Sequence, residues 1–244
     1  MTETTTPTSL SAASAELSLD LIITCADGLE APLQTELTSF GIASEIKSTG
    51  RLAVTGTLRD LYTICLWSRV ASRVLMLIKR KNINAEYDVA EQLYGLAKSV
   101  NWTEQFSLEQ TFAIRLSVDK RVAVSQQFAM LRIKDAIADT FNEVYESRPN
   151  VDSKNPDFSV FATVNDKQAE LYLDLSGTSL HRRGYRVAMT EAPLKENLAA
   201  ALLYSAGWHK KNKAGDAPFY NALIDPMCGS GTFIIEALLM HCDY

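Results

Sequence analysis

The residues best suited to do chemistry lie in the stretch "ALIDPMCGSGTFIIEA" (222–237). Its pattern predicts a strand, a tight turn of small residues and the start of a helix. Gly229 and Gly231 carry no Cβ, so the backbone N–H groups of the turn can approach a ligand closely. The positive end of the following helix points at the same place. The stretch therefore predicts a ligand-binding turn.

Three common ligand-binding turns differ from this one. A P-loop needs GxxxxGK followed by Ser or Thr, and no Lys follows Gly231. A dinucleotide fingerprint needs Gly or Ala where Ile234 stands, and Ile would hold helix and strand apart. A hydrolase elbow needs GxSxG, but Cys228 and Thr232 stand two residues before and after Ser230, where that motif has glycines. Cys228 is interpreted as a small residue that fills the turn, not as a nucleophile.

The elements that must position this turn form three successive units. The first has predicted strands at 20–26, 51–57 and 73–79 and predicted helices at 30–41 and 58–70, which is the order of a ferredoxin-like α+β sandwich. The second has predicted helices at 88–100 and 124–146, a strand at 111–118, and a hairpin of strands 158–164 and 169–175, followed by a polar, basic connector at 176–186.

The third unit opens at Glu191 with a predicted helix that has Pro193 in its first turn and stops at Gly207. A strand at 220–226 and a helix at 231–242 follow. That helix is apolar almost all round, so it is expected to be covered on several sides.

The turn "DPMCGSGT" (225–232) resembles the first motif of adenosylmethionine-dependent methyltransferases, and its Asp-Pro start is typical of those that methylate exocyclic amino groups of bases. "EAPLKENLAAALL" resembles the helix that these enzymes place before that strand. "LDLSGTSLHRRGYR" resembles the corresponding junction in bacterial 23S ribosomal RNA guanine-N2 methyltransferases. "CADGLEAPLQTEL", "LWSRVASRVL", "NWTEQF" and "RPNVD" resemble the amino-terminal part of the same family.

This resemblance implies an α+β chain with a ferredoxin-like domain and a THUMP RNA-binding domain, followed by the incomplete start of an α/β Rossmann-like methyltransferase domain. The expected boundaries are a disordered lead-in at 1–18, the ferredoxin-like domain at 19–80, the THUMP domain at 81–176, a basic connector at 177–190 and the methyltransferase start at 191–244.

The resemblance also implies that S-adenosyl-L-methionine is the cofactor and 23S ribosomal RNA the partner. The residues expected to bind the cofactor are Pro193, Lys195, Asn197, Asp225, Pro226, Cys228, Gly229, Ser230, Gly231 and Thr232. Asp225 is expected near the amino-acid end of the cofactor, with the amides of 228–232 along its methionine and ribose side.

Basic side chains outside the turn are candidates for RNA binding, because phosphates need cations and Arg also stacks on bases. They are Lys120, Arg121, Arg132, Lys134, Arg182, Arg183 and Arg186. The alternative is a solvated surface. For the Arg cluster at 182–186, pairing with acids at a domain interface is a further alternative.

Two motifs of the resembled family are missing: an acid after a second strand and an Asn/Asp-Pro-Pro-Tyr/Phe turn that grips the amino group. "NPDF" (155–158) is not favoured as that turn, because Asp157 stands where Pro is needed. We therefore interpret the chain as the amino-terminal part of a larger methyltransferase, inactive alone, whose remaining domain would be a further partner. A stand-alone RNA-binding protein with a vestigial turn and a tRNA methyltransferase remain alternatives.

Bulk composition narrows the class. The chain has 244 residues and a net charge of −5, so nucleic-acid binding would rest on a local basic patch. Its four cysteines lie far apart, which disfavours a disulfide framework or a zinc cage and favours a reducing, cytoplasmic setting. No apolar run is long enough for a membrane span, and the first residues lack a secretory signal. Neither a metal nor a membrane partner is expected.

Overall fold

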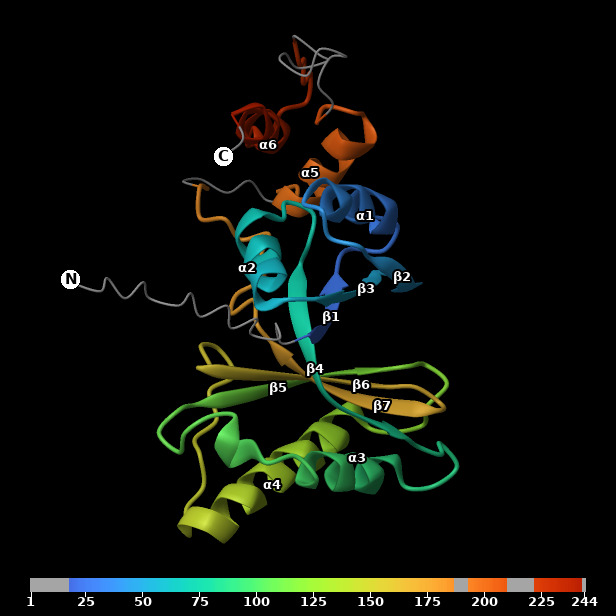
Figure 1. Cartoon of the computed structure of the whole chain (residues 1–244), viewed down its shortest axis with the longest axis vertical. Helices are drawn as coiled ribbons and strands as arrows, with labels where there is room; N and C mark the ends of the chain where they lie inside the picture. The colour runs from blue at the N-terminus through green and yellow to red at the C-terminus, as the bar shows by residue number, and fades with distance from the viewer. Residues whose placement is uncertain (1–17, 187–192, 210–221, 243–244) are drawn as a thin grey trace, which may run out of the picture.

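The structure is a computed structural model that describes residues 18–186, 193–209 and 222–242 (Figure 1). The first unit contains β1 (Leu19–Thr24), α1 (Glu30–Ser39), β2 (Glu45–Ser48), β3 (Arg51–Gly56), α2 (Leu58–Trp67) and β4 (Arg73–Asn82). The second contains α3 (Val89–Lys98), the 3-10 turn η1 (Trp102–Glu104), β5 (Phe112–Val118), α4 (Gln126–Tyr145), β6 (Phe158–Val164) and β7 (Gln168–Asp174). The third contains α5 (Glu196–Ser205) and α6 (Thr232–His241).

The first unit confirms the predicted ferredoxin-like sandwich and adds the short strand β2. Its strands run in the order β2-β3-β1-β4, and all neighbours are antiparallel. Leu33 and Leu37 of α1 are buried against Leu21 and Ile23 of β1. β2 was missed because all four of its residues are exposed, so they show no apolar alternation.

The second unit confirms the predicted hairpin of β6 and β7, and it pairs β5 with β6 in parallel. α3 and α4 pack together on one face of the sheet, below it in Figure 1. Trp102 lies in their core, fully buried, and its indole Nε1 donates to the carbonyl of Ala97 at 2.8 Å. Phe106 of the same core contacts Phe141 and Phe158 at ring-centroid distances of 4.7 Å.

The two units share one seven-stranded sheet in the order β2-β3-β1-β4-β7-β6-β5. β4 joins them: its first residues pair with β1, and residues 75–82 pair with β7, with a bulge between Leu77 and Lys79. β4 ends at Asn82, beyond the predicted end at 79. The polar run "KRKN" (79–82) hid this extension, because its side chains are exposed and the strand is fixed by pairing with β7.

The third unit differs from its prediction in two places. α5 begins at Glu196, and Pro193 lies ahead of the N-cap Lys195 instead of in the first helical turn. The strand predicted at 220–226 is wrong for the described residues 222–226, which have no regular structure. An apolar strand of this kind is stable between paired strands. The described residues offer 222–226 no such partner, and Ile224 is 87% exposed.

α6 lies over α5, at the end of the molecule opposite α3 and α4 (Figure 1). Ala237 and Met240 of α6 pack against Ala200 and Leu203 of α5. The other side of α6 is open, with Leu238 exposed. No helix among the described residues is both long and apolar enough to cross a membrane.

Candidate functional site

The glycine turn before α6 is open on its outer side. Gly229 and Gly231 have φ angles of +52° and +74°, in the left-handed region that favours glycine. A Cβ built on either residue would meet no atom within 4 Å. The turn is closed by one short bond, from the Gly231 amide to the Cys228 carbonyl at 2.7 Å. The glycines therefore serve both the backbone conformation and close access to the backbone.

Asp225 presents an unused acceptor beside this turn. Its Oδ1 accepts from the Met227 amide at 3.1 Å, whereas its Oδ2 is buried and has no hydrogen-bond partner among the described residues. Gly231 is the N-cap of α6, and no side chain of the described residues caps this helix end. A buried oxygen without a donor is costly, and an uncapped helix start attracts electron-rich groups. The turn thus fits a ligand that brings both a donor and polar acceptors.

The segment before α5 borders a different hollow. Pro193, Lys195 and Asn197 line a cavity of about 540 Å³, together with Ser72 and His181. The Asn197 amide donates to the Ser72 hydroxyl at 2.9 Å, so this side chain faces the first unit. No described residue of the glycine turn lines this cavity, so these three predicted cofactor residues border a different hollow.

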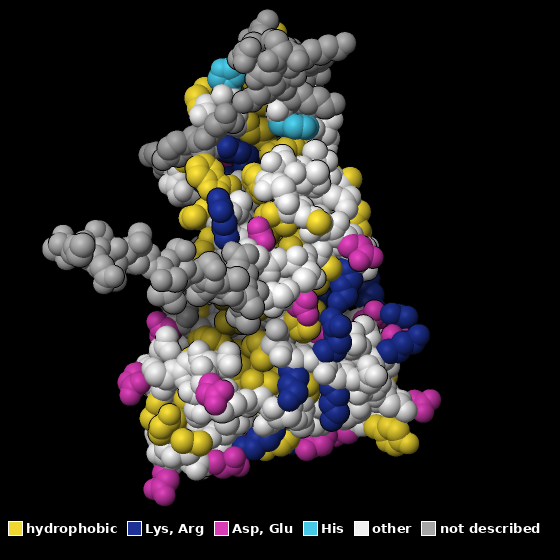
Figure 2. Space-filling model, in the orientation of Figure 1, with side chains coloured by type: hydrophobic (Ala, Val, Ile, Leu, Met, Phe, Trp, Pro, Cys, Tyr) yellow, Lys and Arg dark blue, Asp and Glu magenta, His cyan; other side chains and the backbone are white. Residues whose placement is uncertain are grey.

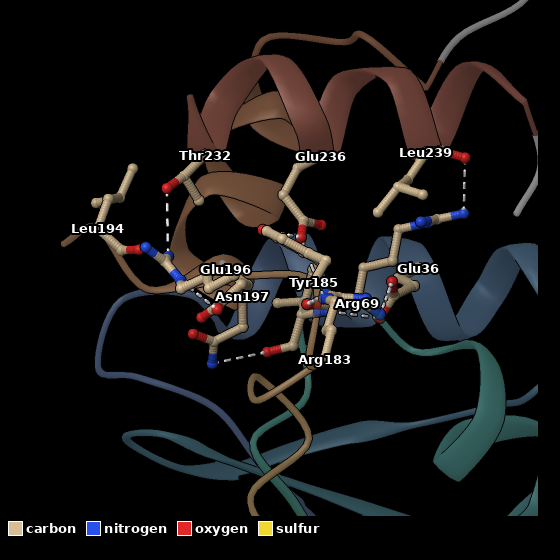
Figure 3. Close-up of polar contacts among 12 residues, drawn as sticks. Glu36, Arg69, Arg183, Tyr185, Leu194, Glu196, Asn197, Thr232, Glu236 and Leu239 are labelled. Atoms are coloured by element: carbon tan, nitrogen blue, oxygen red, sulfur yellow. Dashed lines mark hydrogen bonds and ion pairs between the residues drawn. The ribbon is translucent and has the colours of Figure 1, made fainter. Parts of the chain in front are cut away.

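Arg186 connects the two segments. Its Nε donates to Glu196 Oε1 at 2.6 Å, and its two terminal nitrogens donate to the hydroxyls of Ser230 and Thr232 at 3.2 Å each. It also donates to the carbonyl of Leu194. Thr232, Leu194 and Glu196 converge here from α6 and from the start of α5 (Figure 3). Burial raises the pKa of Glu196, but the Arg186 hydrogen bond and charge outweigh it, so the net pKa lies below its usual range.

Arg183 ties α6 to the first unit. Its Nε forms an ion pair with the fully buried Glu236 at 3.2 Å, and its terminal nitrogen donates to the Arg69 carbonyl at 2.6 Å (Figure 3). The Tyr185 hydroxyl donates to the same Glu236 oxygen at 2.9 Å. Burial raises the pKa of Glu236, an effect that Arg183 and Tyr185 only partly offset.

The first unit contributes a buried acid to the same contact. Glu36 of α1 accepts from the Ser68 hydroxyl at 2.5 Å and from the Arg69 amide at 2.7 Å, and burial raises its pKa. The Arg69 guanidinium in turn donates to the carbonyl of Leu239 in α6 at 3.2 Å (Figure 3). Buried polar side chains with defined partners thus join the ferredoxin-like unit to the helix that follows the turn.

The remaining predicted RNA-binding residues lie apart from this junction. Lys120 and Arg121 are exposed after β5, and Arg121 pairs with Asp119, whose pKa it holds at about 2. Arg132 pairs with Glu91 at 2.5 Å and lies 4.2 Å above the Tyr94 ring.

Lys134 borders an apolar hollow on α4, where it lies beside Met130 and Leu131. Arg182 is exposed, unlike its neighbours Arg183 and Arg186, which are 18% and 14% exposed. The structure does not gather the predicted basic residues into one patch.

Further basic residues escaped the sequence analysis. Lys47 and Arg51 line a hollow of about 480 Å³ together with Arg121, between the β2–β3 turn and the ends of β5, β6 and β7. Arg80, at the end of β4, pairs with Glu170 at 2.8 Å, as Lys47 does at 3.3 Å. In the view of Figure 2, Lys and Arg side chains gather over the middle of the molecule, with acids among them. Only the shared sheet brings these residues together.

Three family descriptions match successive parts of the chain. "RlmL ferredoxin-like domain" matches residues 20–75, "THUMP domain" matches 87–174, and "RMKL-like, methyltransferase domain" matches 183–244. A ribosomal RNA large subunit methyltransferase K/L of Psychrobacter arcticus is 95% identical over the whole chain, and one of Acinetobacter baumannii is 46% identical over 91% of it.

The chain belongs to the family of ribosomal RNA large subunit methyltransferases K/L. It spans about a third of the length of these relatives, 32% and 30% in the two cases. The predicted family resemblance and fold class are thereby confirmed, with this chain as an amino-terminal part of the family.

Solved structures agree with this family. A predicted N6-adenine-specific DNA methylase from Listeria monocytogenes is 30% identical, with a TM-score of 0.74 over 93% of this chain and 56% of its own. A protein described as a methyltransferase and complexed with SAH is 26% identical, with a TM-score of 0.74 over 92% of this chain and 56% of its own.

Three buried acids at this junction were not predicted from the sequence: Glu36, Glu196 and Glu236. A signal was present for Glu236, which is the single charge in the apolar run "TFIIEALLM". Among the described residues, no group of three or more His, Cys, Asp or Glu side chains could hold a metal ion.

Proposed function

We propose that this chain recruits 23S ribosomal RNA and supplies the first cofactor-binding turn of an S-adenosyl-L-methionine-dependent guanine-N2 methyltransferase. The observation that carries the proposal is the open glycine turn beside an Asp225 oxygen that has no partner among the described residues. Arg183 ties the helix after this turn to the first unit, and Arg186 ties the turn to the segment before α5. A cytoplasmic location is part of the same proposal.

The residues of the turn fit this cofactor. Its methionyl ammonium and ribose hydroxyls are donors, which the buried Asp225 Oδ2 lacks among the described residues. Its carboxylate and ring nitrogens are acceptors for backbone amides at 228–232 and for the start of α6. Gly229 and Gly231 keep side-chain bulk away from the ligand, and Lys195 is exposed beside the neighbouring hollow.

When bound, the cofactor supplies an electrophilic methyl group on its sulfonium sulfur. With the cofactor held at residues 225–232, the methyl group would pass to guanine N2 as the carbon–sulfur bond breaks. S-adenosylhomocysteine would be left, and the amino group would give up one proton. The guanine must be unpaired or flipped so that its amino group can reach this carbon. The contribution of this chain is to bind and orient both partners. We assign the group that accepts hydrogen bonds from this amino group to the part of the relatives that this chain does not span.

Transfer of labelled methyl from adenosylmethionine to unmodified 23S ribosomal RNA tests the proposal. The 244-residue chain and a protein of the relatives' full length that begins with this chain are compared. We expect RNA binding by both and turnover by the longer protein alone. Turnover by the short chain would refute the assigned division of roles. Absence of turnover and of S-adenosylhomocysteine binding in the longer protein would refute the cofactor assignment.

A further inference from the structure

We propose that Arg186 is a positioning residue for the cofactor turn, which it holds in place against the segment before α5. This inference rests on the proposed function, and it moves Arg186 from the predicted RNA contacts to the cofactor side of the molecule. Arg186 lies in the connector, outside both of the segments that it joins.

The hydrogen bonds of Arg186 divide evenly between those segments. The Leu194 carbonyl lies just before α5 and Glu196 Oε1 on its first residue, while the hydroxyls of Ser230 and Thr232 belong to the turn and to the first residue of α6. A planar guanidinium has five N–H donors in a fixed fork, so it can address four acceptors at once. Lys has three donors around a point charge and cannot reproduce this geometry.

These bonds leave Arg186 poorly available for RNA. Its side chain is 14% exposed, and its paired carboxylate Glu196 is 8% exposed. A phosphate would have to displace that acid from a largely water-free site. Arg182 is exposed and lies four residues away in the same connector, so it is the better candidate for a phosphate contact.

The turn itself has few other restraints. Gly231 has a left-handed φ, and no side chain of the described residues caps α6. Within the turn, the hydroxyls of Ser230 and Thr232 lie 3.3 Å apart, and Arg186 contacts both. A turn already fixed in its binding conformation loses less entropy when a ligand binds. Arg186 therefore raises cofactor affinity without contacting the cofactor.

The test uses Arg186→Gln, Arg186→Lys and the matched control Arg182→Gln in a protein of the relatives' full length that begins with this chain. Calorimetry gives the Kd for S-adenosylhomocysteine, and hydrogen exchange reports on the amides of 228–234. Salt-dependent binding to 23S ribosomal RNA gives the number of phosphate contacts. Thermal melts show whether each variant is folded.

We expect Arg186→Gln to raise the Kd for S-adenosylhomocysteine by about 10-fold or more, since bonds from a charged donor are lost. Exchange at 228–234 should speed up, and the RNA salt slope should stay unchanged. KM for adenosylmethionine should rise while kcat at saturation holds. Arg186→Lys should restore part of the affinity. Arg182→Gln should leave cofactor binding intact and reduce the salt slope by about 1.

An unchanged Kd together with unchanged exchange at 228–234 in Arg186→Gln would overturn the inference, as would a reduced salt slope with normal cofactor affinity. If Arg186→Gln does not fold, Arg186→Lys decides by the same two readouts. If the unsubstituted protein fails to bind S-adenosylhomocysteine, the proposed function fails. In that case faster exchange in the variants still supports the positioning role, and unchanged exchange overturns it.

Discussion

Replacing Glu236 by Leu should weaken the packing of α6 against the first unit and favour its local opening. Glu236 is fully buried and accepts the Tyr185 hydroxyl while pairing with Arg183. Its loss leaves the Arg183 guanidinium, 18% exposed, with the Arg69 carbonyl as its remaining acceptor among the described residues. The variant thus removes a charge partner from a site with little access to water.

The size of the effect follows from this burial. Removing one partner of a buried ion pair costs roughly 3–5 kcal/mol, because the other charge stays buried and uncompensated. Arg183 keeps one acceptor and some contact with water, so we expect the lower end, about 3 kcal/mol. This equals a change of roughly 100-fold in the opening equilibrium of α6. Arg183→Met should cost less, about 2 kcal/mol, because the buried Glu236 keeps the Tyr185 hydroxyl and can take up a proton.

The double variant Arg183→Met/Glu236→Leu separates the energy of the ion pair from that of side-chain packing. Apolar side chains of similar volume often replace a buried pair at little cost. We expect the double variant to cost about 2 kcal/mol, well below the combined effect of the single changes. The coupling energy is then about 3 kcal/mol, within the range for contacting residues.

Native-state hydrogen exchange of the α6 amides measures each opening free energy in the intact chain. Arg148→Met is the matched control, since Arg148 is 63% exposed and pairs with the 36% exposed Asp139 at 3.5 Å. It should change stability by less than about 0.5 kcal/mol. If the effects at positions 183 and 236 add to within about 0.5 kcal/mol, the pair does not couple the connector to α6 and the reasoning is refuted.

Two further predictions concern other parts of the chain. Trp102→Ala should lower the urea stability of the THUMP unit by about 3–5 kcal/mol, through a core cavity and loss of the bond to the Ala97 carbonyl; a loss below about 1 kcal/mol would contradict this. For Glu196, whose pKa is lowered by Arg186, stabilisation is present above the ordinary pKa of 4.5 and is lost as pH falls through the folded pKa. Exchange of α5 below pH 4.5 should thus respond to pH less steeply in Glu196→Gln, and equal slopes would refute the pairing.

The sequence determined the features that depend on local rules. Apolar periodicity and capping residues predicted most helices and strands of the first two units, and the hairpin of β6 and β7 was predicted directly. The glycine turn was also readable from sequence, because its predicted function depends on small residues and an acid at fixed spacing. The roles of the individual turn residues stay predictions.

Only the tertiary structure decided how the units meet. The exposed run 79–82 gave no sign that β4 continues, because its conformation is fixed by hydrogen bonds to β7 and not by burial. The strand predicted at 220–226 lacks paired neighbours at its described residues, 222–226, so its apolar pattern does not suffice to form it there. In the connector, Arg182, Arg183 and Arg186 are alike in sequence but differ in exposure. Burial beside Glu196 and Glu236 depends on the packing of α5 and α6, which no local pattern encodes.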